Sequence, residues 1–270
     1  MNKILYFETS SGFGGSASAL ALLLKYIKRD VYHTIVMASN DGPQFKKIRD
    51  LGIEIFKYPY ADIYEGSRNK WFGYLKLIIT FFTKTIPGIF YLCKFIVNKN
   101  IDIIHVNTNI YTGVPAILAA KIKNIKCVCH IRATRSASAL EKYLLRWVDT
   151  VIVLNSDVQK NFEQLISKEK VRLIYDGIEF NNSNNLSLAK DSNGETVVGI
   201  VGRIVKGKGH KEFILAAKKI IEQYPDTRFR IIGDSKGSNQ SYHQEVKELI
   251  KNEGMEQSII FAGWRDDIYA

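Results

Sequence analysis

The sequence predicts an α/β protein built from two domains with parallel sheets, the second of them incomplete. Its 270 residues exceed one ordinary domain, and 46% apolar residues supply enough side chains for two cores. Short apolar runs alternate with segments of helical periodicity, which is typical of parallel strands covered on both faces. A polar stretch over 181–195 interrupts this alternation and predicts a linker. We therefore expect one domain at 1–180 and a second at 196–270.

The first domain has six apolar runs of β-rich composition, separated by segments of helical periodicity. Its opening reads as βαβαβ, and the same alternation resumes after a long apolar stretch. The predicted strands lie at 3–7, 33–39, 53–59, 102–107, 126–132 and 150–156. The predicted helices lie at about 17–28, 44–52, 113–122 and 140–147.

The long apolar stretch over 71–97 has the length of a membrane span but not its composition. Lys76, Lys84 and Lys94 interrupt it, and Pro87 lies near its middle. Crossing a bilayer would place Lys84 deep in hydrocarbon, at a cost of roughly 3 kcal/mol. We therefore favour a helix pair packed on the sheet. A helix lying in the membrane interface and a spanning helix are the alternatives.

The second domain repeats the alternation over a shorter length. Strands are predicted at 196–202, 228–234 and 258–263, with helices at about 211–224 and 242–253. A doubly wound domain has about six strands in the order 3-2-1-4-5-6, so that the fourth strand lies beside the first. Only three strands are predicted here. We expect the first of them to have an open side that exposes backbone groups and apolar side chains.

The net charge of +11 lies almost entirely in the first domain. Residues 1–180 hold 25 Lys and Arg against 15 Asp and Glu, whereas residues 181–270 hold 13 against 12. Such a basic field attracts polyanions, anionic lipids or phosphorylated substrates, or serves solubility alone. The charge is diffuse and no aromatic-basic reading motif occurs, so we do not expect a nucleic-acid partner.

Cysteine usage and the first residues bear on location. Cys93, Cys127 and Cys129 form no even disulfide framework, and the last two are too closely spaced for a usual zinc knuckle. The chain begins MNKILYF and continues into polar residues, without the long apolar segment or the cleavage site of a secretory leader. We expect a cytoplasmic protein that holds no metal.

A first glycine-rich loop, SSGFGGSASAL over 10–20, follows a strand and opens a helix. Backbone N–H groups at such a helix N-terminus bind anions. Gly12, Gly14 and Ala17 fit the G-x-G-x-x-A spacing of a dinucleotide loop, and Asp41 lies 24 residues further on. The glycines, however, come later after the strand than in that fingerprint. We favour a loop for substrate or phosphate; a nicotinamide site and a plain structural turn are the alternatives.

A second glycine-rich loop lies in VGRIVKGKGHKEF, which directly follows an apolar strand. Arg203 and Lys208 lie at the carboxyl end of that strand, with Gly207 and Gly209 on either side of the lysine. Ligands gather at this end of parallel strands, and an Arg fork with a Lys point charge suits a diphosphate. The two cations would offset charge on a leaving nucleoside diphosphate without a metal. Spacing alone leaves two solvated surface cations equally open.

The segment VGRIVKGKGHKEFILAA resembles the glycine-arginine, lysine-glycine and helix segment of the family 4 retaining glycosyltransferases. Further segments resemble the same family in the same order along nearly the whole chain. They are SGFGGSASAL, IDIIHVN, CVCHIRA, VIVLNSDVQKNF, KVRLIYDGIEF and SIIFAGWRDDI. The resemblance implies the GT-B fold, in which the first Rossmann-like domain takes the acceptor and the second the donor nucleotide.

The resemblance also implies roles for individual residues. Arg203 and Lys208 would hold the donor diphosphate, and His130 would be the catalytic residue near the transferred sugar. A lone histidine at a strand end more often has a structural role, which we expect for His105. In the first glycine loop, the donor phosphate or the acceptor would lie against Gly14, Gly15 and Ser16.

Three departures from the family pattern stand out. Asp176 to Glu179, read as DGIE, stand where members usually have Asn-Gly-Val-Asp. Arg132 and the residues after it replace commoner acidic or glycine residues. The 270 residues also stop before the position at which the family has two glutamates separated by seven residues, which contact the donor. We therefore expect weak or no transferase activity from these residues alone.

These observations predict a retaining glycosyltransferase that moves a sugar from a nucleoside-diphosphate sugar to a glycan or lipid-linked acceptor, in bacterial cell-surface polysaccharide synthesis. No cofactor is expected. The basic first domain and the stretch over 71–97 favour peripheral docking on the anionic inner face of the membrane. The main alternative is a non-catalytic nucleotide- or glycan-binding subunit that needs a partner chain. A nicotinamide-dependent oxidoreductase is disfavoured, because it leaves Arg203 and Lys208 unexplained.

Overall fold

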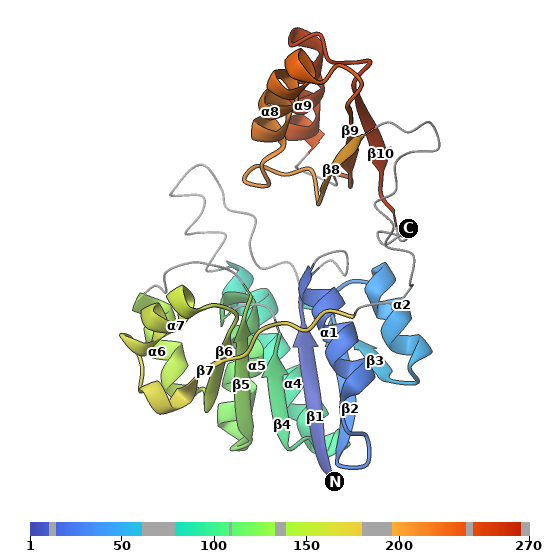
Figure 1. The fold of residues 1–270 in the computed structure, drawn as a ribbon. Helices are drawn as coiled ribbons and strands as arrows, with labels where there is room; N and C mark the ends of the chain where they lie inside the picture. The colour runs from blue at the N-terminus through green and yellow to red at the C-terminus, as the bar shows by residue number, and fades with distance from the viewer. Residues whose placement is uncertain are drawn as a thin grey trace. The chain divides into compact units, whose positions relative to one another are not determined.

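A computed structural model describes residues 1–10, 15–60, 79–107, 110–132, 139–179, 196–235 and 240–265 (Figure 1). The chain divides into two compact units, Met1–Phe180 and Asn181–Ala270. Each unit carries its own parallel sheet, with two hydrophobic cores in the first unit and one in the second.

The first unit is built on a seven-stranded sheet in the order β3-β2-β1-β4-β5-β6-β7, with every neighbouring pair parallel. The order reverses direction between β1 and β4, which is the switch point where ligands of open α/β sheets bind. The strands are β1 (Asn2–Glu8), β2 (Tyr32–Ala38), β3 (Glu54–Lys57), β4 (Ile103–Val106), β5 (Lys126–Ile131), β6 (Thr150–Val153) and β7 (Val171–Leu173).

Alternate side chains along β1 enter two different cores of this unit. Leu5 and Phe7 lie in the larger core, together with residues of α4, α5 and α7, whereas Ile4 and Tyr6 lie in a smaller core with residues of α1 and α2. Both faces of the sheet are thus used, as parallel sheets require. The helices are α1 (Gly15–Tyr26), α2 (Pro43–Asp50), α4 (Ile86–Lys99), α5 (Ile110–Lys123), α6 (Ala139–Leu144) and α7 (Ser156–Glu163). Single turns form η1 (Phe81–Thr85), η2 (Leu145–Trp147) and η3 (Lys168–Lys170).

The α1 side of this sheet is covered by two kinds of structure. Helices α1 and α2 pack beside β1 to β3, whereas residues 174–179, which follow β7, run across β6, β5 and β4 toward α1 (Figure 1). We call residues 174–179 the crossing segment. Its far end is tied to α1, because Glu179 accepts hydrogen bonds from Lys25 Nζ at 2.5 Å and from the Tyr26 hydroxyl at 2.6 Å.

The apolar stretch predicted at 71–97 falls partly on residues 61–78, which lie outside the described residues. From residue 79 onward it forms η1 and α4, and Leu92, Cys93 and Ile96 pack into the larger core. Pro87 is the second residue of α4, directly after the π-helical η1. No helix in the described part of the chain is both long enough and apolar enough to cross a bilayer.

The second unit has a three-stranded parallel sheet in the order β10-β9-β8. Its helices pack on the strands around one core that contains Ile214, Phe229 and Val246. Among the described residues β8 is an edge strand, and Val201 and Ile260 are each about half exposed. The elements are β8 (Val197–Val201), α8 (His210–Gln223), β9 (Arg228–Ile232), α9 (Gln240–Asn252) and β10 (Ile259–Gly263).

A close backbone approach joins the ends of β8 and β9. Gly233 has a φ of +142°, and a Cβ atom there would lie 1.8 Å from the carbonyl oxygen of Gly202. Only glycine fits this position. The contact fixes where the chain leaves β8, and hence where the glycine loop after it begins.

Candidate functional site

A buried carboxylate ends β1 at the carboxyl edge of the first sheet. Glu8 is fully buried, and its Oε1 accepts a hydrogen bond from the Ser10 backbone N–H at 2.8 Å. Its Oε2 accepts one from Asn107 Nδ2 at 2.5 Å. Burial raises the pKa of Glu8, and the hydrogen bonds from Asn107 and Ser10 act in the opposite direction. Both oxygens therefore have partners within the protein.

Asn107, directly after β4, connects this carboxylate to the first turn of α1. Its Nδ2 donates a second hydrogen bond to the Ser16 carbonyl at 3.2 Å, and its Oδ1 accepts from Arg132 Nε at 3.2 Å. A flipped amide would turn its NH₂ toward the guanidinium and its oxygen toward Glu8, which no hydrogen bond could satisfy. The amide orientation is fixed by its neighbours.

Arg132 follows β5 and joins three segments of the chain. Its Nη1 donates to both carboxylate oxygens of Asp176 in the crossing segment, at 2.7 and 2.6 Å. Its Nε also donates to the Asn107 carbonyl at 3.1 Å, and its Nη2 lies 3.2 Å from His130 Nδ1. The side chain is only 7% exposed. Its charge is thus offset inside the fold rather than by solvent.

His130 lies near the end of β5 and is 5% exposed. Burial, assisted by the nearby charge of Arg132, lowers its pKa to about 3, so the imidazole is neutral at physiological pH. The pKa of His105 on β4 is also lowered to about 3, mainly by burial and further by His130 and Arg132. The Nε2 atoms of both rings are buried and have no hydrogen-bond partner among the described residues.

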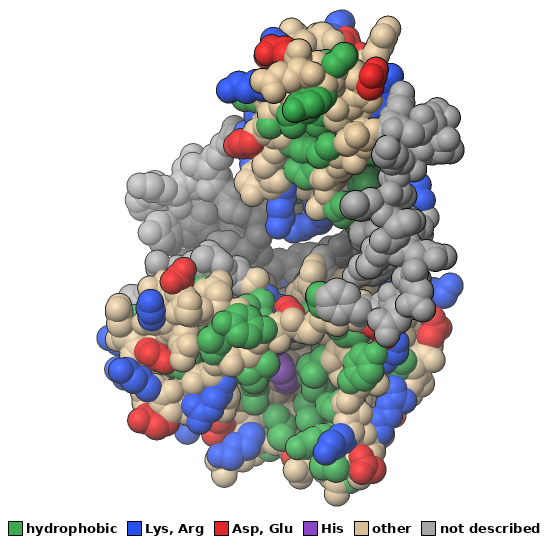
Figure 2. Space-filling view, in the orientation of Figure 1, with side chains coloured by type: hydrophobic (Ala, Val, Ile, Leu, Met, Phe, Trp, Pro, Cys, Tyr) green, Lys and Arg blue, Asp and Glu red, His purple; other side chains and the backbone are tan. Residues whose placement is uncertain are grey.

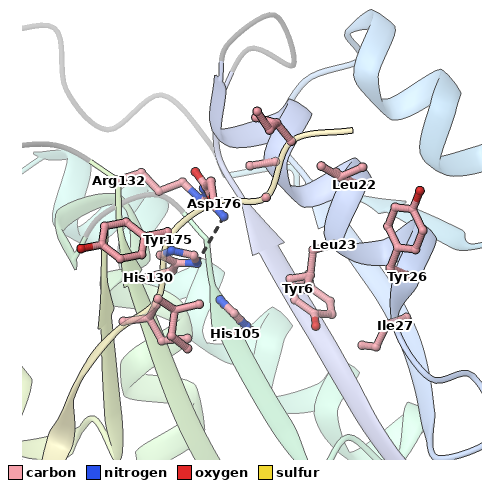
Figure 3. A pocket seen from close by; sticks show the side chains of 15 residues that line it. Tyr6, Leu22, Leu23, Tyr26, Ile27, His105, His130, Arg132, Tyr175 and Asp176 are labelled. Atoms are coloured by element: carbon pink, nitrogen blue, oxygen red, sulfur yellow. Dashed lines mark hydrogen bonds and ion pairs between the residues drawn. The ribbon is translucent and has the colours of Figure 1, made fainter. Parts of the chain in front are cut away.

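A pocket of about 440 Å³ lies over these histidines, between α1 and the crossing segment (Figure 3). The His105 ring centroid lies 4.9 Å from that of Tyr6 and 5.7 Å from that of His130. Figure 2 shows hydrophobic side chains gathered around a hollow in this face, with a histidine visible inside it. The walls are mostly apolar and come from α1 and the crossing segment: Leu22, Leu23, Tyr26, Ile174, Tyr175 and Ile178.

The first glycine loop is only partly described. Gly14 lies outside the described residues. Gly15 begins α1 and is exposed, and a Cβ atom there would meet nothing within 4 Å, so packing does not require a glycine at this position. Ser16 takes part through its carbonyl, which Asn107 holds. Asp41 forms an ion pair with Arg49 at 2.6 Å on the surface, which accounts for it without a ribose.

The second glycine loop leads from β8 into α8. Gly207 and Gly209 have φ angles of +85° and +82°, which L side chains rarely adopt, so these two glycines shape the loop. Gly209 is the N-cap of α8 and has no side chain to satisfy the free N–H groups of the first turn. The helix N-terminus therefore carries unsatisfied donors beside the loop cations.

The four cations of this second loop and of the start of α8 fall into two pairs. Lys206 and Lys211 reach the same carboxylate, that of Glu245 on α9, at 3.5 and 2.9 Å. Arg203 and Lys208 are exposed and have no ion pair with any described residue. Two positive charges thus remain available to an external anion next to the α8 N-terminus.

Sequence reasoning singled out neither Glu8 nor Asn107, and it noted Arg132 and Asp176 only as departures from a pattern. The sequence did contain a signal: Glu8 ends one buried strand, Asn107 directly follows a second, and Arg132 directly follows a third. Because β1, β4 and β5 are neighbours, polar residues at their carboxyl ends meet at one edge of the sheet.

Known structures resemble this chain along almost its whole length. HepE of Anabaena, crystallised with UDP and glucose, is 22% identical, with 99% of this chain and 71% of that chain covered at a TM-score of 0.72. A glycosyltransferase of Rickettsia africae is 17% identical, covering 99% and 69%, with a TM-score of 0.69. Sucrose-phosphate synthase of Thermosynechococcus elongatus is 16% identical, covering 100% and 72%, with a TM-score of 0.70. The fold is of the GT-B type, as the sequence predicts.

Family models agree with this fold. Residues 13–182 match the model described as Glycosyltransferase Family 4, and residues 186–270 match Glycosyl transferases group 1. No curated protein sequence gives a significant match. The chain belongs to glycosyltransferase family 4, a family of retaining enzymes that use nucleotide sugars, and this confirms the resemblance drawn from its motifs.

Proposed function

We propose that this protein transfers a sugar, with retention, from a nucleoside-diphosphate sugar to a glycan or lipid-linked acceptor. The donor site is inferred from the difference between paired and unpaired cations in the second glycine loop. Glu245 forms ion pairs with Lys206 and Lys211, whereas Arg203 and Lys208 have none with any described residue and are left for a ligand. A diphosphate carries the charge and the oxygen acceptors that an Arg fork, a Lys and a helix N-terminus together bind.

A uridine nucleotide is the first donor to examine. HepE of Anabaena has been crystallised with UDP-glucose. In the transfer step the bond between the sugar and the diphosphate breaks, and Arg203 and Lys208 offset the charge that develops on the leaving phosphate. The acceptor hydroxyl attacks the same face of the sugar from which that phosphate departs, and its proton passes to the leaving phosphate oxygen. The first unit supplies His130 and the loop that contains Gly14, Gly15 and Ser16 to position the sugar and the acceptor.

Titration calorimetry with UDP tests the donor site. Arg203→Ala and Lys208→Ala should each weaken binding by about 1.5–3 kcal/mol, because each removes a charge-assisted hydrogen bond. Lys206→Ala is the matched control, since Glu245 already holds that ammonium, and it should change the affinity little. Equal losses in all three variants would show a general charge effect and contradict a specific site.

The acceptor side of the proposal includes a membrane surface. Five exposed apolar residues of η1, its flank and α4 form what we call the apolar stripe, in which Phe90 is 71% and Phe82 63% exposed. Phe90 and Val97 lie seven residues apart, on one face of α4. With the exposed Lys94 between them, this composition fits an anionic lipid interface, where lipid-linked acceptors lie. The members of the stripe are Ile79, Phe81, Phe82, Phe90 and Val97.

Liposome flotation tests this docking. The protein should bind vesicles that contain anionic lipid, and binding should fall with salt. Phe90→Ser should reduce it, whereas Leu215→Ser, at an exposed apolar position of the second unit, should not. No binding to anionic vesicles at low salt would contradict the proposal.

A non-catalytic binding subunit is the second candidate. The edge position of β8 and the half-exposed Val201 favour it, because a partner chain would cover them. Turnover of UDP-sugar by these 270 residues separates the two: transfer at the rate of a longer relative would exclude the second candidate. Synthesis of a cell-surface polysaccharide remains our proposal for the pathway, supported by a likeness to the lipopolysaccharide galactosyltransferase WaaB at 15% identity and a TM-score of 0.57.

A further inference from the structure

Three segments that are distant in the sequence meet at the guanidinium of Arg132. They are the ends of β4 and β5 and the crossing segment, and Asn107 extends the contact to Glu8 on β1 and to Ser16 on α1. All these partners lie within the first unit. Burying such a cluster of polar groups costs stability unless each group has its hydrogen-bond partners. We therefore looked for a role of this cluster beyond stability.

We propose that Arg132 is a positioning residue: it holds His130 as a neutral imidazole with its proton on Nε2, and it anchors the crossing segment through Asp176. The role in sugar transfer rests on the proposed function. The His130 tautomer and the anchoring of the crossing segment do not depend on that function, and each is tested by a separate measurement.

The tautomer follows from the hydrogen-bonding capacity of the two groups. A guanidinium has five N–H donors and no acceptor. The contact of 3.2 Å between Arg132 Nη2 and His130 Nδ1 therefore requires a lone pair on Nδ1. A neutral imidazole carries one proton, which must then lie on Nε2.

This tautomer decides what His130 offers a ligand. Its Nε2 has no partner among the described residues, and the residue lines the pocket of about 440 Å³ (Figure 3). With the proton on Nε2, the ring donates a hydrogen bond and has no free lone pair with which to remove a proton. His130 is thus not suited to act as a general base, and because its Nε2 is buried, the ring could donate to a sugar or acceptor oxygen only after the pocket opens around it.

Lysine cannot replace arginine in this role. Arg132 uses its Nε, Nη1 and Nη2 toward acceptors on three segments, and these directions are set by the planar fork. An ammonium offers one nitrogen and reaches one such cluster at a time. Arg132→Lys retains the charge and loses the geometry, which makes it the informative variant beside Arg132→Met.

Nitrogen-15 NMR of the histidine rings tests the tautomer. In the unaltered chain the His130 Nε2 signal should be that of a protonated ring nitrogen and Nδ1 that of an unprotonated one, from pH 8 down to about pH 5, because the pKa is lowered to about 3. Arg132→Met and Arg132→Lys should give mixed tautomers, and Arg132→Met should raise the pKa. Arg49→Met, which removes a surface cation paired with Asp41, should leave the ring signals unchanged. A proton on Nδ1 in the unaltered chain, or identical signals in the Arg132 variants, would overturn the proposal.

Hydrogen exchange tests the anchor in a chain that keeps its arginine. Asp176→Asn should speed exchange of the amides of the crossing segment while the His130 tautomer is retained. Glu179→Gln, at the far end of the same segment, removes an ion pair between exposed side chains and should speed this exchange less than Asp176→Asn does. Unchanged exchange in Asp176→Asn would refute the anchor even if an Arg132 variant failed to fold.

Steady-state kinetics test the link to transfer. Arg132→Lys should lower kcat roughly ten- to hundredfold, because a misplaced His130 loses the reacting geometry. The KM for donor should stay nearly constant, since Arg203 and Lys208 hold the diphosphate. A change confined to donor KM would contradict the positioning role. Absence of turnover in the unaltered chain counts against the proposed function, whereas the NMR and exchange results judge Arg132 by themselves.

Discussion

The two glycine-rich loops of this chain differ in how the charges around them are satisfied. Near the first, Glu8, Asn107 and Arg132 are buried and satisfy one another. Near the second, Arg203 and Lys208 are exposed, and no described residue pairs with them. Charges that are already paired can fix geometry, whereas exposed charges without a partner can bind ligands. This contrast is the basis of our proposals that the first unit positions the substrates and that the second binds the donor diphosphate.

The largest loss of stability is expected when the close backbone approach beneath the second loop is disrupted. Gly233→Ala would force a Cβ atom against the Gly202 carbonyl and place alanine at a φ of +142°, so we expect the second unit to lose about 3 kcal/mol or more of unfolding free energy. Gly199→Ala is the control, because its Cβ would meet only ordinary contacts. Urea unfolding can be followed by Trp264 fluorescence with the other tryptophans replaced. Similar losses in both variants would show that the close approach does not matter.

The next largest loss of stability is expected when the side-chain amide of Asn107 is removed. Asn107→Ala leaves Glu8 Oε2 without its hydrogen bond and takes away the Oδ1 acceptor that Arg132 uses, inside a buried site. We expect the first unit to lose about 2–4 kcal/mol of unfolding free energy. Gln159→Ala, which removes an amide that pairs within α7, should cost much less. A loss for Asn107→Ala no greater than this control would mean that the buried polar groups are not coupled.

Acid should weaken the first unit through its two neutral histidines. Their pKa values are lowered from 6.5 to about 3, so between these limits the unfolded chain binds protons that the folded chain does not. The unfolding free energy should fall as pH falls, by up to about 1.4 kcal/mol per pH unit for each histidine. The raised pKa of Glu8 opposes this trend at the acidic end. Replacing His105 and His130 by Asn should flatten the slope measured by urea unfolding between pH 4.5 and 7.5, and an unchanged slope would contradict the assignment.

The smallest expected effect is a gain in UDP affinity at the second loop. Glu245→Gln frees Lys206 and Lys211, which adds positive potential beside the loop. UDP should bind more tightly, by about two- to fivefold at low salt, and the gain should disappear at high salt, because exposed charges are screened. Calorimetry at two salt concentrations measures this. Weaker binding would show that Glu245 positions the loop rather than neutralising it.

Local patterns predicted most of the fold. The alternation of apolar runs and helical periods located most strands and helices to within a few residues, because strand burial and helix amphipathicity are set by neighbouring residues. It missed β7, which is only three residues long, and α7. The GT-B fold class followed from motif order. The continuation of the helix through Pro87 was less clear, since a proline within an apolar run usually indicates an interruption.

The candidate site was predictable only in part. Arg203 and Lys208 could be named from their position after a strand, but their difference from Lys206 and Lys211 depends on Glu245, more than thirty residues further on. The pair of Glu8 and Asn107 joins strand ends that are 99 residues apart. The neutral state of His130 depends on burial and on Arg132. Such contacts come from the topology of the sheet, which no local pattern contains.

A crystal structure of the protein with UDP bound is the decisive test of the donor site. The diphosphate should lie at the N-terminus of α8, with its oxygens within hydrogen-bonding distance of the Arg203 guanidinium and the Lys208 ammonium. A nucleotide bound elsewhere, with both side chains directed into solvent, would contradict it.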